Sequence, residues 1–163
     1  MTLEGRVTVE VQVASSVNHV PNSADIRKWI EATIAEAVGA RSCEVSVRVV
    51  DEEESRDLNN RFRGKDHATN VLSFPTDESM ACLSAELQGT LGDIVICGPV
   101  VESEAGEQGK DIAHHWAHLL IHGTLHLLGH DHMAEADARR MEALEIRILG
   151  LRGVADPYIT DEH

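Results

Sequence analysis

The residues of this chain best suited to chemistry are three histidines in its C-terminal third, His122, His126 and His132. Two histidines four positions apart on an α-helix lie one turn apart on one face, so His122 and His126 can reach a single metal ion. Gly129 follows, and glycine readily adopts the left-handed conformation that ends a helix. The chain can then turn back and bring His132 to the same ion. Three protein ligands and an open coordination position are typical of a catalytic zinc site.

The spacing of these histidines is that of the long zincin motif, His-Glu-x-x-His-x-x-Gly-x-x-His, in which the glutamate is the general base. Gly123 occupies the position of that glutamate. A zinc peptidase needs a carboxylate there to accept a proton from water. The sequence therefore predicts a metal site and argues against peptide hydrolysis. The alternative interpretation, a buried histidine-rich helix without metal, is disfavoured by the glycine in register.

Composition and charge limit the classes to which the protein can belong. The 163 residues suit one domain, and 42% hydrophobic with 26% charged residues is typical of a globular protein. The sequence has no run of about eighteen apolar residues and no signal-peptide core, so we expect a cytoplasmic protein without a membrane partner. The three scattered cysteines, Cys43, Cys82 and Cys97, are expected to be small core residues in a reducing compartment.

The formal net charge of −14 argues against non-specific attraction to nucleic acid, and we expect no DNA partner. Any role directed at RNA must then depend on a local positive region. One dense group of basic residues occurs beside a glycine-containing loop, and it comprises Arg56, Arg61, Arg63 and Lys65. Basic residues are common near the C-terminal ends of helices, so this pattern alone assigns no role to Arg63.

Apolar periodicity predicts the elements that position these residues. Alternation or short apolar runs predict strands over 6–14, 43–50, 71–74 and 90–97. Helical spacing predicts helices over 23–39, 51–63, 100–109, 112–128 and 134–149, with Ser23 and Asp111 as the expected N-caps of the first and fourth. The segment 76–88 is expected to be a long surface loop. The first strand, helix and strand predict a parallel crossover.

We therefore expect a single α+β domain over residues 1–163. Its small mixed sheet of four strands should pack with about five helices around a central metal-bearing helix.

Three blocks of this sequence resemble the YbeY endoribonucleases, the bacterial ribosomal RNA maturation factors. They span residues 58–75, 91–97 and 122–132 and read LNNRFRGKDHATNVLSFP, LGDIVIC and HGTLHLLGHDH. With the order of elements between them, the resemblance covers most of the chain from about residue 45 to 150, while the N-terminal strand and helix match only in type. The family usually has tyrosine where this chain has His130, so two neighbouring histidines compete for the third ligand position.

The resemblance implies a zincin-like fold and a metal-dependent, single-strand-directed endoribonuclease. Such enzymes act in ribosomal RNA maturation, notably at the 3′ end of the small-subunit RNA, and in ribosome quality control. The implied partners are precursor ribosomal RNA and the ribosome or its proteins. The family's metal histidines fall on His122, His126 and His132, with one zinc or other divalent transition metal ion per chain. Its functional arginine falls on Arg63.

Phosphodiester cleavage develops negative charge that an arginine fork can hold, so Arg63 is the candidate catalytic residue. Asp131 is a candidate partner for a metal histidine or a cap of the turn, and His114 and His118 are expected to be buried or to support the ligands. Asp93 is more simply a turn or edge residue. Two other functions remain as alternatives: a metallopeptidase, and a non-catalytic ribosome assembly factor with a structural metal.

Overall fold

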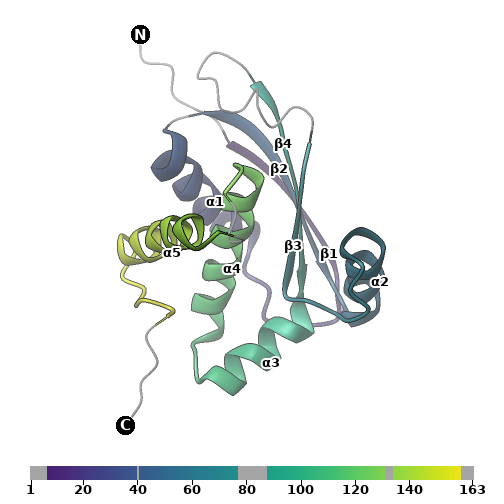
Figure 1. The fold of residues 1–163 in the computed structure, drawn as a ribbon. Coiled ribbons are helices and arrows are strands. Elements are labelled where there is room, and N and C mark those ends of the chain that lie inside the picture. The colour runs from purple at the N-terminus through teal and green to yellow at the C-terminus, as the bar shows by residue number, and fades with distance from the viewer. Residues whose placement is uncertain (1–6, 40, 77–87, 131–133, 159–163) are drawn as a thin grey trace.

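The computed structural model describes residues 7–39, 41–76, 88–130 and 134–158 (Figure 1). Its strands are β1 (Val7–Ala14), β2 (Ser42–Val50), β3 (Val71–Pro75) and β4 (Gln88–Cys97). Its helices are α1 (Ser23–Val38), α2 (Glu52–Arg63), α3 (Gly98–Gln108), α4 (Ile112–Leu127) and α5 (Glu135–Gly150). The predicted α+β class, with a mixed four-stranded sheet and five helices among the described residues, is confirmed.

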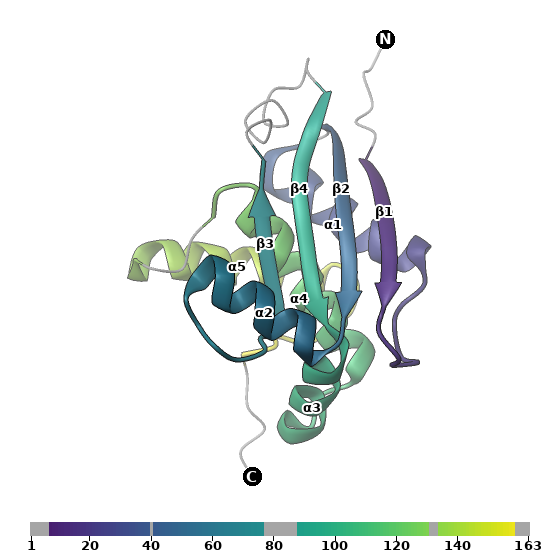
Figure 2. The ribbon, with the colours of Figure 1, turned by 90° about the vertical axis from the view of Figure 1, so that its right-hand side faces the viewer.

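The four strands form one sheet in the order β1-β2-β4-β3. β2 pairs in parallel with both β1 and β4, whereas β3 pairs antiparallel with β4. The parallel pairing of β1 with β2 confirms the predicted crossover through α1. β3 is the short strand at one edge of the sheet, as the view onto the α2 side shows (Figure 2).

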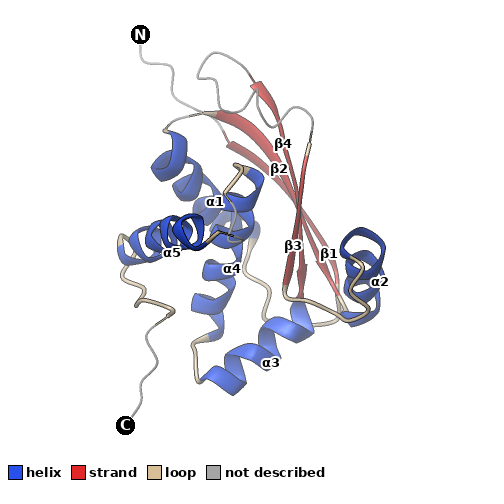
Figure 3. Cartoon of the chain, viewed as in Figure 1, coloured by secondary structure: helices blue, strands red, loops and turns tan. Residues whose placement is uncertain are grey.

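Helices cover the two faces of the sheet unequally. α1, α4 and α5 lie on one face and α2 crosses the other (Figures 1 and 3). Neighbouring residues of β3 contact both layers: Ser73 Oγ donates to the carbonyl oxygen of Gly123 in α4 at 2.9 Å, while the Phe74 ring packs edge-on against Phe62 of α2 at 5.2 Å. Successive strand residues point to opposite faces, so β3 lies between α2 and α4.

The central helix, α4, is buried nearly all round, as its sequence predicts. Trp116 and Leu120 of this helix pack in one apolar cluster with Ile30 of α1 and with Val47 and Ile94 of the sheet. Burying each side chain of this size stabilises the fold by about 1.5–3 kcal/mol. The cluster therefore holds α4 in place against α1 and the sheet, and so sets the position of the histidines on this helix.

The N-caps of two helices test the expectations drawn from the sequence. Asp111 caps α4 as predicted, because its Oδ1 accepts from the backbone N–H of Ala113 at 2.9 Å and of His114 at 3.3 Å. The prediction of Ser23 as the N-cap of α1 is wrong. Asn22 takes that role: its Oδ1 accepts from the N–H of Asp25 at 2.8 Å, which leaves Ser23 as the first helical residue.

Other expectations meet the structure in part. Cys43 and Cys97 are buried, which confirms them as core residues, whereas Cys82 lies outside the described residues. Most of the loop predicted over 76–88 also lies outside them, and its last residue already belongs to β4. No helix of the described chain combines the length and apolarity needed to cross a membrane.

Candidate functional site

His122 and His126 lie one turn apart on α4, and both side chains are half-buried. Their Nε2 atoms are 3.1 Å apart, and the ring planes cross at 73°. Two nitrogens that each bind one zinc ion at about 2.0–2.1 Å in tetrahedral geometry would lie about 3.3 Å apart. The two imidazoles therefore already converge as a pair of ligands to one ion would.

The end of α4 has the geometry expected from Gly129. This glycine has φ of 96°, its N–H donates to His126 O, and the N–H of His130 donates to Leu125 O, both at 3.0 Å. This is the hydrogen-bond pattern by which a left-handed residue ends a helix and reverses the chain. His132 and Asp131 lie outside the described residues, so their roles stay predictions.

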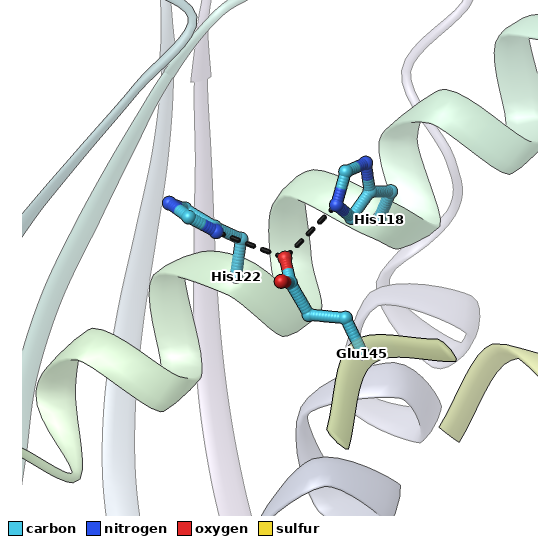
Figure 4. A group of neighbouring side chains, drawn as sticks. All are labelled: His118, His122 and Glu145. Atoms are coloured by element: carbon cyan, nitrogen blue, oxygen red, sulfur yellow. Dashed lines mark hydrogen bonds and ion pairs between the residues drawn. The ribbon is translucent and has the colours of Figure 1, made fainter. Parts of the chain in front are cut away.

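A carboxylate from α5 reaches the histidines of α4. Glu145 is fully buried, and its Oε1 lies 2.9 Å from Nδ1 of His122 and 2.9 Å from Nε2 of His118 (Figure 4). The three side chains offer ligand atoms within 4.8 Å of one another, so this group can hold a metal ion. The expectation that His118 supports its neighbours is consistent with these contacts. His114, in contrast, is exposed at the start of α4.

The contacts of Glu145 also determine its ionisation. Burial alone would raise the pKa of its carboxyl, but the hydrogen bonds from His118 and His122 outweigh burial and lower the pKa to about 2. The carboxylate oxygen Oε1 lies 2.9 Å from Nδ1 of His122 and accepts a hydrogen bond there, so Nδ1 is the nitrogen that donates. A metal binds an imidazole through the other, unprotonated nitrogen. Nε2 of His122, which faces His126, is therefore the atom suited to a metal.

Sequence reasoning missed Glu145, although a signal was available. Met141, Glu145, Ile148 and Leu149 share one face of α5, and all four are buried. A charged residue at such an apolar position needs a partner, and histidines on the facing helix can provide one. The sequence carried no comparable signal for Tyr158, whose hydroxyl donates to Oε2 of Glu145 at 2.8 Å.

Arg63 is the last residue of α2 and is exposed, as is Lys65. Neither forms an ion pair with a carboxylate of the described residues. The other two basic residues of the group predicted as a positive region are already compensated: Arg56 donates twice to Asp66, at 2.7 and 3.0 Å, and Arg61 pairs with Asp57 at 3.5 Å. Arg56 and Arg61 are therefore paired with carboxylates in this structure, whereas Arg63 and Lys65 are not paired with any carboxylate of the described residues.

Two buried polar side chains tie α2 to the loop that follows it. Ser55 Oγ donates to Thr69 O at 3.0 Å, and Asn59 Nδ2 donates to His67 O at 2.8 Å. Both side chains are almost completely buried, at 1% and 2% exposure, so these bonds are shielded from water. They fix the loop against the helix end that carries Arg63. That end and α4 lie on opposite faces of the sheet, with the edge strand β3 between them (Figure 2).

Comparison with known proteins shows the family of this chain. The family model described as "Endoribonuclease YbeY" matches residues 10–152. The chain belongs to this family. It is 50% identical over 155 residues to the endoribonuclease YbeY of Stutzerimonas stutzeri, covering 95% of this chain and 93% of that protein. It is 55% identical over 138 residues to the endoribonuclease YbeY of Halorhodospira halophila, covering 85% and 88%.

A solved structure shares the fold of this YbeY family member. The solution structure of TM1509 from Thermotoga maritima superposes with a TM-score of 0.54 at 22% identity, over 93% of this chain and 99% of that one. The family resemblance drawn from the three sequence blocks is confirmed.

Gly123, which stands where the zincin motif has its glutamate, lies at a close contact between α4 and the sheet. A β-carbon at this position would lie 3.1–3.3 Å from side-chain atoms of Ile94, Ser73 and Val71, so α4 packs closely on the sheet here. A larger side chain at position 123 would therefore require these neighbours to shift, and glycine permits the close packing. Asp93 lies on the α2 face of the sheet, exposed, in a groove of about 630 Å³ that Phe62 and Phe74 also line. The expectation that Asp93 is a turn or edge residue is wrong, because it pairs with both neighbouring strands inside β4, between β2 and β3.

Proposed function

We propose that this chain is a metal-dependent endoribonuclease that cleaves single-stranded segments of ribosomal RNA precursors. In this proposal one divalent ion, zinc in the first instance, is held by His122, His126 and His132. The observation that carries it is the 3.1 Å approach of the two Nε2 atoms on α4, in a chain about half identical to proteins named endoribonuclease YbeY. Maturation of the small-subunit RNA 3′ end, ribosome quality control, ribosomal partners and a cytoplasmic location belong to the same proposal.

The donor set suits zinc or a similar transition metal, because neutral imidazole nitrogens are favoured ligands of such ions. When bound, the ion supplies a Lewis acid for phosphoryl oxygens and lowers the pKa of water. The chain contributes the rest: α4 fixes the two imidazoles, Glu145 holds the proton of His122 on Nδ1, and the turn at Gly129 leads towards His132.

Arg63 is proposed to bind the scissile phosphate. Its guanidinium can donate two parallel hydrogen bonds to phosphate oxygens, and this pairing strengthens as negative charge develops. RNA is proposed to approach the β3 edge through Arg63 and Lys65, because a chain of net charge −14 must attract it locally. An RNA strand that bends around this short edge would contact both faces of the sheet.

The test compares RNA with protein as substrate. The purified protein is incubated with an RNA that contains paired and single-stranded segments, and separately with casein, before and after treatment with a chelator. We expect cleavage of single-stranded RNA, its loss after chelation, its recovery with added zinc, and intact casein. Casein cleavage would support the peptidase, and intact RNA with every divalent metal would support a non-catalytic assembly factor.

Two variants exclude a contaminating nuclease. His126→Ala removes a proposed ligand and should abolish cleavage. His114→Ala removes an exposed histidine from the first turn of the same helix and should leave cleavage unchanged. Equal activity in both preparations would mean that the nuclease is not this chain.

A further inference from the structure

Glu145 is a fully buried carboxylate with three hydrogen-bond donors, and only one of them belongs to the proposed metal ligands. Oε1 accepts from His118 and His122, and Oε2 accepts from the hydroxyl of Tyr158 at 2.8 Å. The same hydroxyl lies 3.2 Å from Nε2 of His118. The segment after α5 therefore returns to α4 and closes a hydrogen-bonded network beneath His122.

The Tyr158 contact is built by the chain around it. The N–H of Tyr158 donates to Oδ1 of Asp156 at 2.8 Å, which forms a tight turn. The tyrosine ring meets the ring of His118 edge-on, with centroids 5.4 Å apart and planes at 85°. Burial and the negative charge of Glu145 raise the pKa of the tyrosine hydroxyl, so it stays protonated and donates.

These contacts remove the freedom of the carboxylate to rotate. Tyr158 holds one oxygen, and His118 holds the other, so Oε1 stays directed at Nδ1 of His122. Each of the two oxygens has a partner, as a buried ion requires. The orientation of Glu145 is thus set before any metal binds, and the orientation of His122 follows from it.

We infer that Glu145, held by Tyr158 and His118, is a positioning residue that keeps the proton of His122 on Nδ1 and directs Nε2 towards His126. The inference rests on the proposed function, because it places the metal at the Nε2 atoms. A carboxylate that accepts from a ligating histidine fixes its tautomer and strengthens it as a ligand. Tyr158, which follows α5, thereby supports the proposed metal site without contacting the metal.

The competing arrangement makes Glu145 a ligand. Its Oε1, His118 Nε2 and His122 Nδ1 lie close enough to hold an ion between them. That ion would replace the hydrogen bonds from His118 and His122 to Glu145. The two Nε2 atoms of His122 and His126, 3.1 Å apart, would then not bind it. The two arrangements predict opposite effects of the same substitutions, which the experiments below exploit.

The first experiment measures the tautomer of His122 in the full-length, metal-free protein by long-range ¹H–¹⁵N correlation, at alkaline pH where each imidazole carries one proton. We expect the Nδ1–H tautomer in the wild type. In Glu145→Gln the amide can donate to Nδ1, so the Nε2–H tautomer should appear. An Nε2–H tautomer in the wild type, or no change in Glu145→Gln, would overturn the inference.

The second experiment measures zinc affinity by competition with a chelator. We expect Glu145→Gln to bind zinc about 10- to 100-fold more weakly, and Tyr158→Phe about tenfold more weakly, with one ion still bound per chain in both. If Glu145 were a ligand, Glu145→Gln would lose stoichiometric binding, while His126→Ala would keep it. That pair of results would also overturn the inference.

A matched control is a carboxylate on α3 that pairs with another histidine of α4. Glu104 accepts from Nε2 of His115 at 3.0 Å, as Glu145 accepts from His118, but its contacts do not include His122. Glu104→Gln should therefore leave zinc affinity within about twofold of the wild type. An equal loss in Glu104→Gln would reduce Glu145 to a general stabiliser of α4.

Two further measurements separate the possible failures. Thermal unfolding of each metal-free variant shows whether it folds. If Glu145→Gln does not fold, the zinc affinity of Tyr158→Phe, which lacks only one hydroxyl, tests the inference instead. Neither the tautomer nor the zinc affinity requires RNA cleavage. A wild-type protein that binds zinc through His126 but leaves RNA intact would contradict the proposed function and leave the positioning role standing.

Discussion

Arg63 and Arg56 lie on the same helix but differ in what already occupies their guanidinium groups. Arg56 donates twice to Asp66, whereas Arg63 has no carboxylate partner among the described residues. A guanidinium that is already paired must break two hydrogen bonds before it can hold a phosphate. At the scale of single residues, Arg63 is therefore the better candidate for binding the scissile group.

Arg63→Lys tests whether the fork or only the charge is needed. Lysine keeps the positive charge but cannot donate two parallel hydrogen bonds from one planar group. We expect the cleavage rate at saturating RNA to fall about 10- to 100-fold, with zinc content and thermal stability unchanged. Arg56→Lys is the matched control and should cleave at nearly the wild-type rate. Near-normal turnover in Arg63→Lys would leave this arginine as an ordinary surface charge.

The histidine pair could be predicted from the sequence because helix geometry is rigid and local. A spacing of four residues fixes the relative position of His122 and His126, and Gly129 marks where the chain turns. Glu145 depends instead on how α5 packs against α4, which no local pattern states. Its signal was a charge at an apolar position. Tyr158 had none, since its place follows from a turn beyond the last helix.

Among the elements, α2 is the one whose placement matters most to the proposed site, because it carries Arg63. Arg48 of β2 donates to Glu54 of α2 through Nε at 2.5 Å and Nη2 at 2.8 Å. This bidentate pair anchors the first half of α2 to the sheet. Ser55 and Asn59 anchor the loop that follows. The sheet thus holds the start of α2, and the loop that leads into β3 is held against the rest of the helix.

The anchor predicts a pH dependence of stability. The hydrogen bonds from Arg48 hold the pKa of the Glu54 carboxyl below its usual value, against a smaller opposing effect of burial. A carboxyl with a depressed folded pKa contributes stability above its unfolded pKa and loses it as the pH falls through the folded value. The free energy of unfolding should therefore fall more between about pH 5 and pH 3 in the wild type than in Glu54→Gln.

Urea unfolding at several pH values in this window measures the difference. Glu53→Gln, which changes the exposed carboxylate one position earlier, is the control and should follow the wild type. Parallel curves for the wild type and Glu54→Gln would mean that the ion pair contributes nothing measurable, as many exposed pairs do.

The bounds of the elements were largely predictable, whereas their arrangement, apart from the parallel crossover from β1 to β2, was not. Alternating valines located β1 and β2, and apolar residues at helical spacing located α4 and α5, because these patterns arise within a segment. The strand order β1-β2-β4-β3 depends on contacts between distant segments, such as Ser73 with Gly123. The placement of α2 on the face opposite to α4 follows from the same contacts and had no signal in the sequence.

The molecule as a whole carries a negative charge, and so does the RNA that is its proposed substrate. The chain has 28 acidic and 14 basic residues, so long-range attraction cannot recruit RNA. Local contacts at the β3 edge must do so, and among the described residues there Arg63 and Lys65 are cations without a carboxylate partner. The metal proposed at His122 and His126 would supply the positive charge on the other face.

The most direct test of the central claim is the metal content of the purified full-length chain. The claim is that His122 and His126, with His132, bind one ion. After incubation with zinc and removal of the excess, elemental analysis should find about one equivalent in the wild type and in His114→Ala, and almost none in His126→Ala. A full equivalent of tightly bound zinc in His126→Ala would contradict the account.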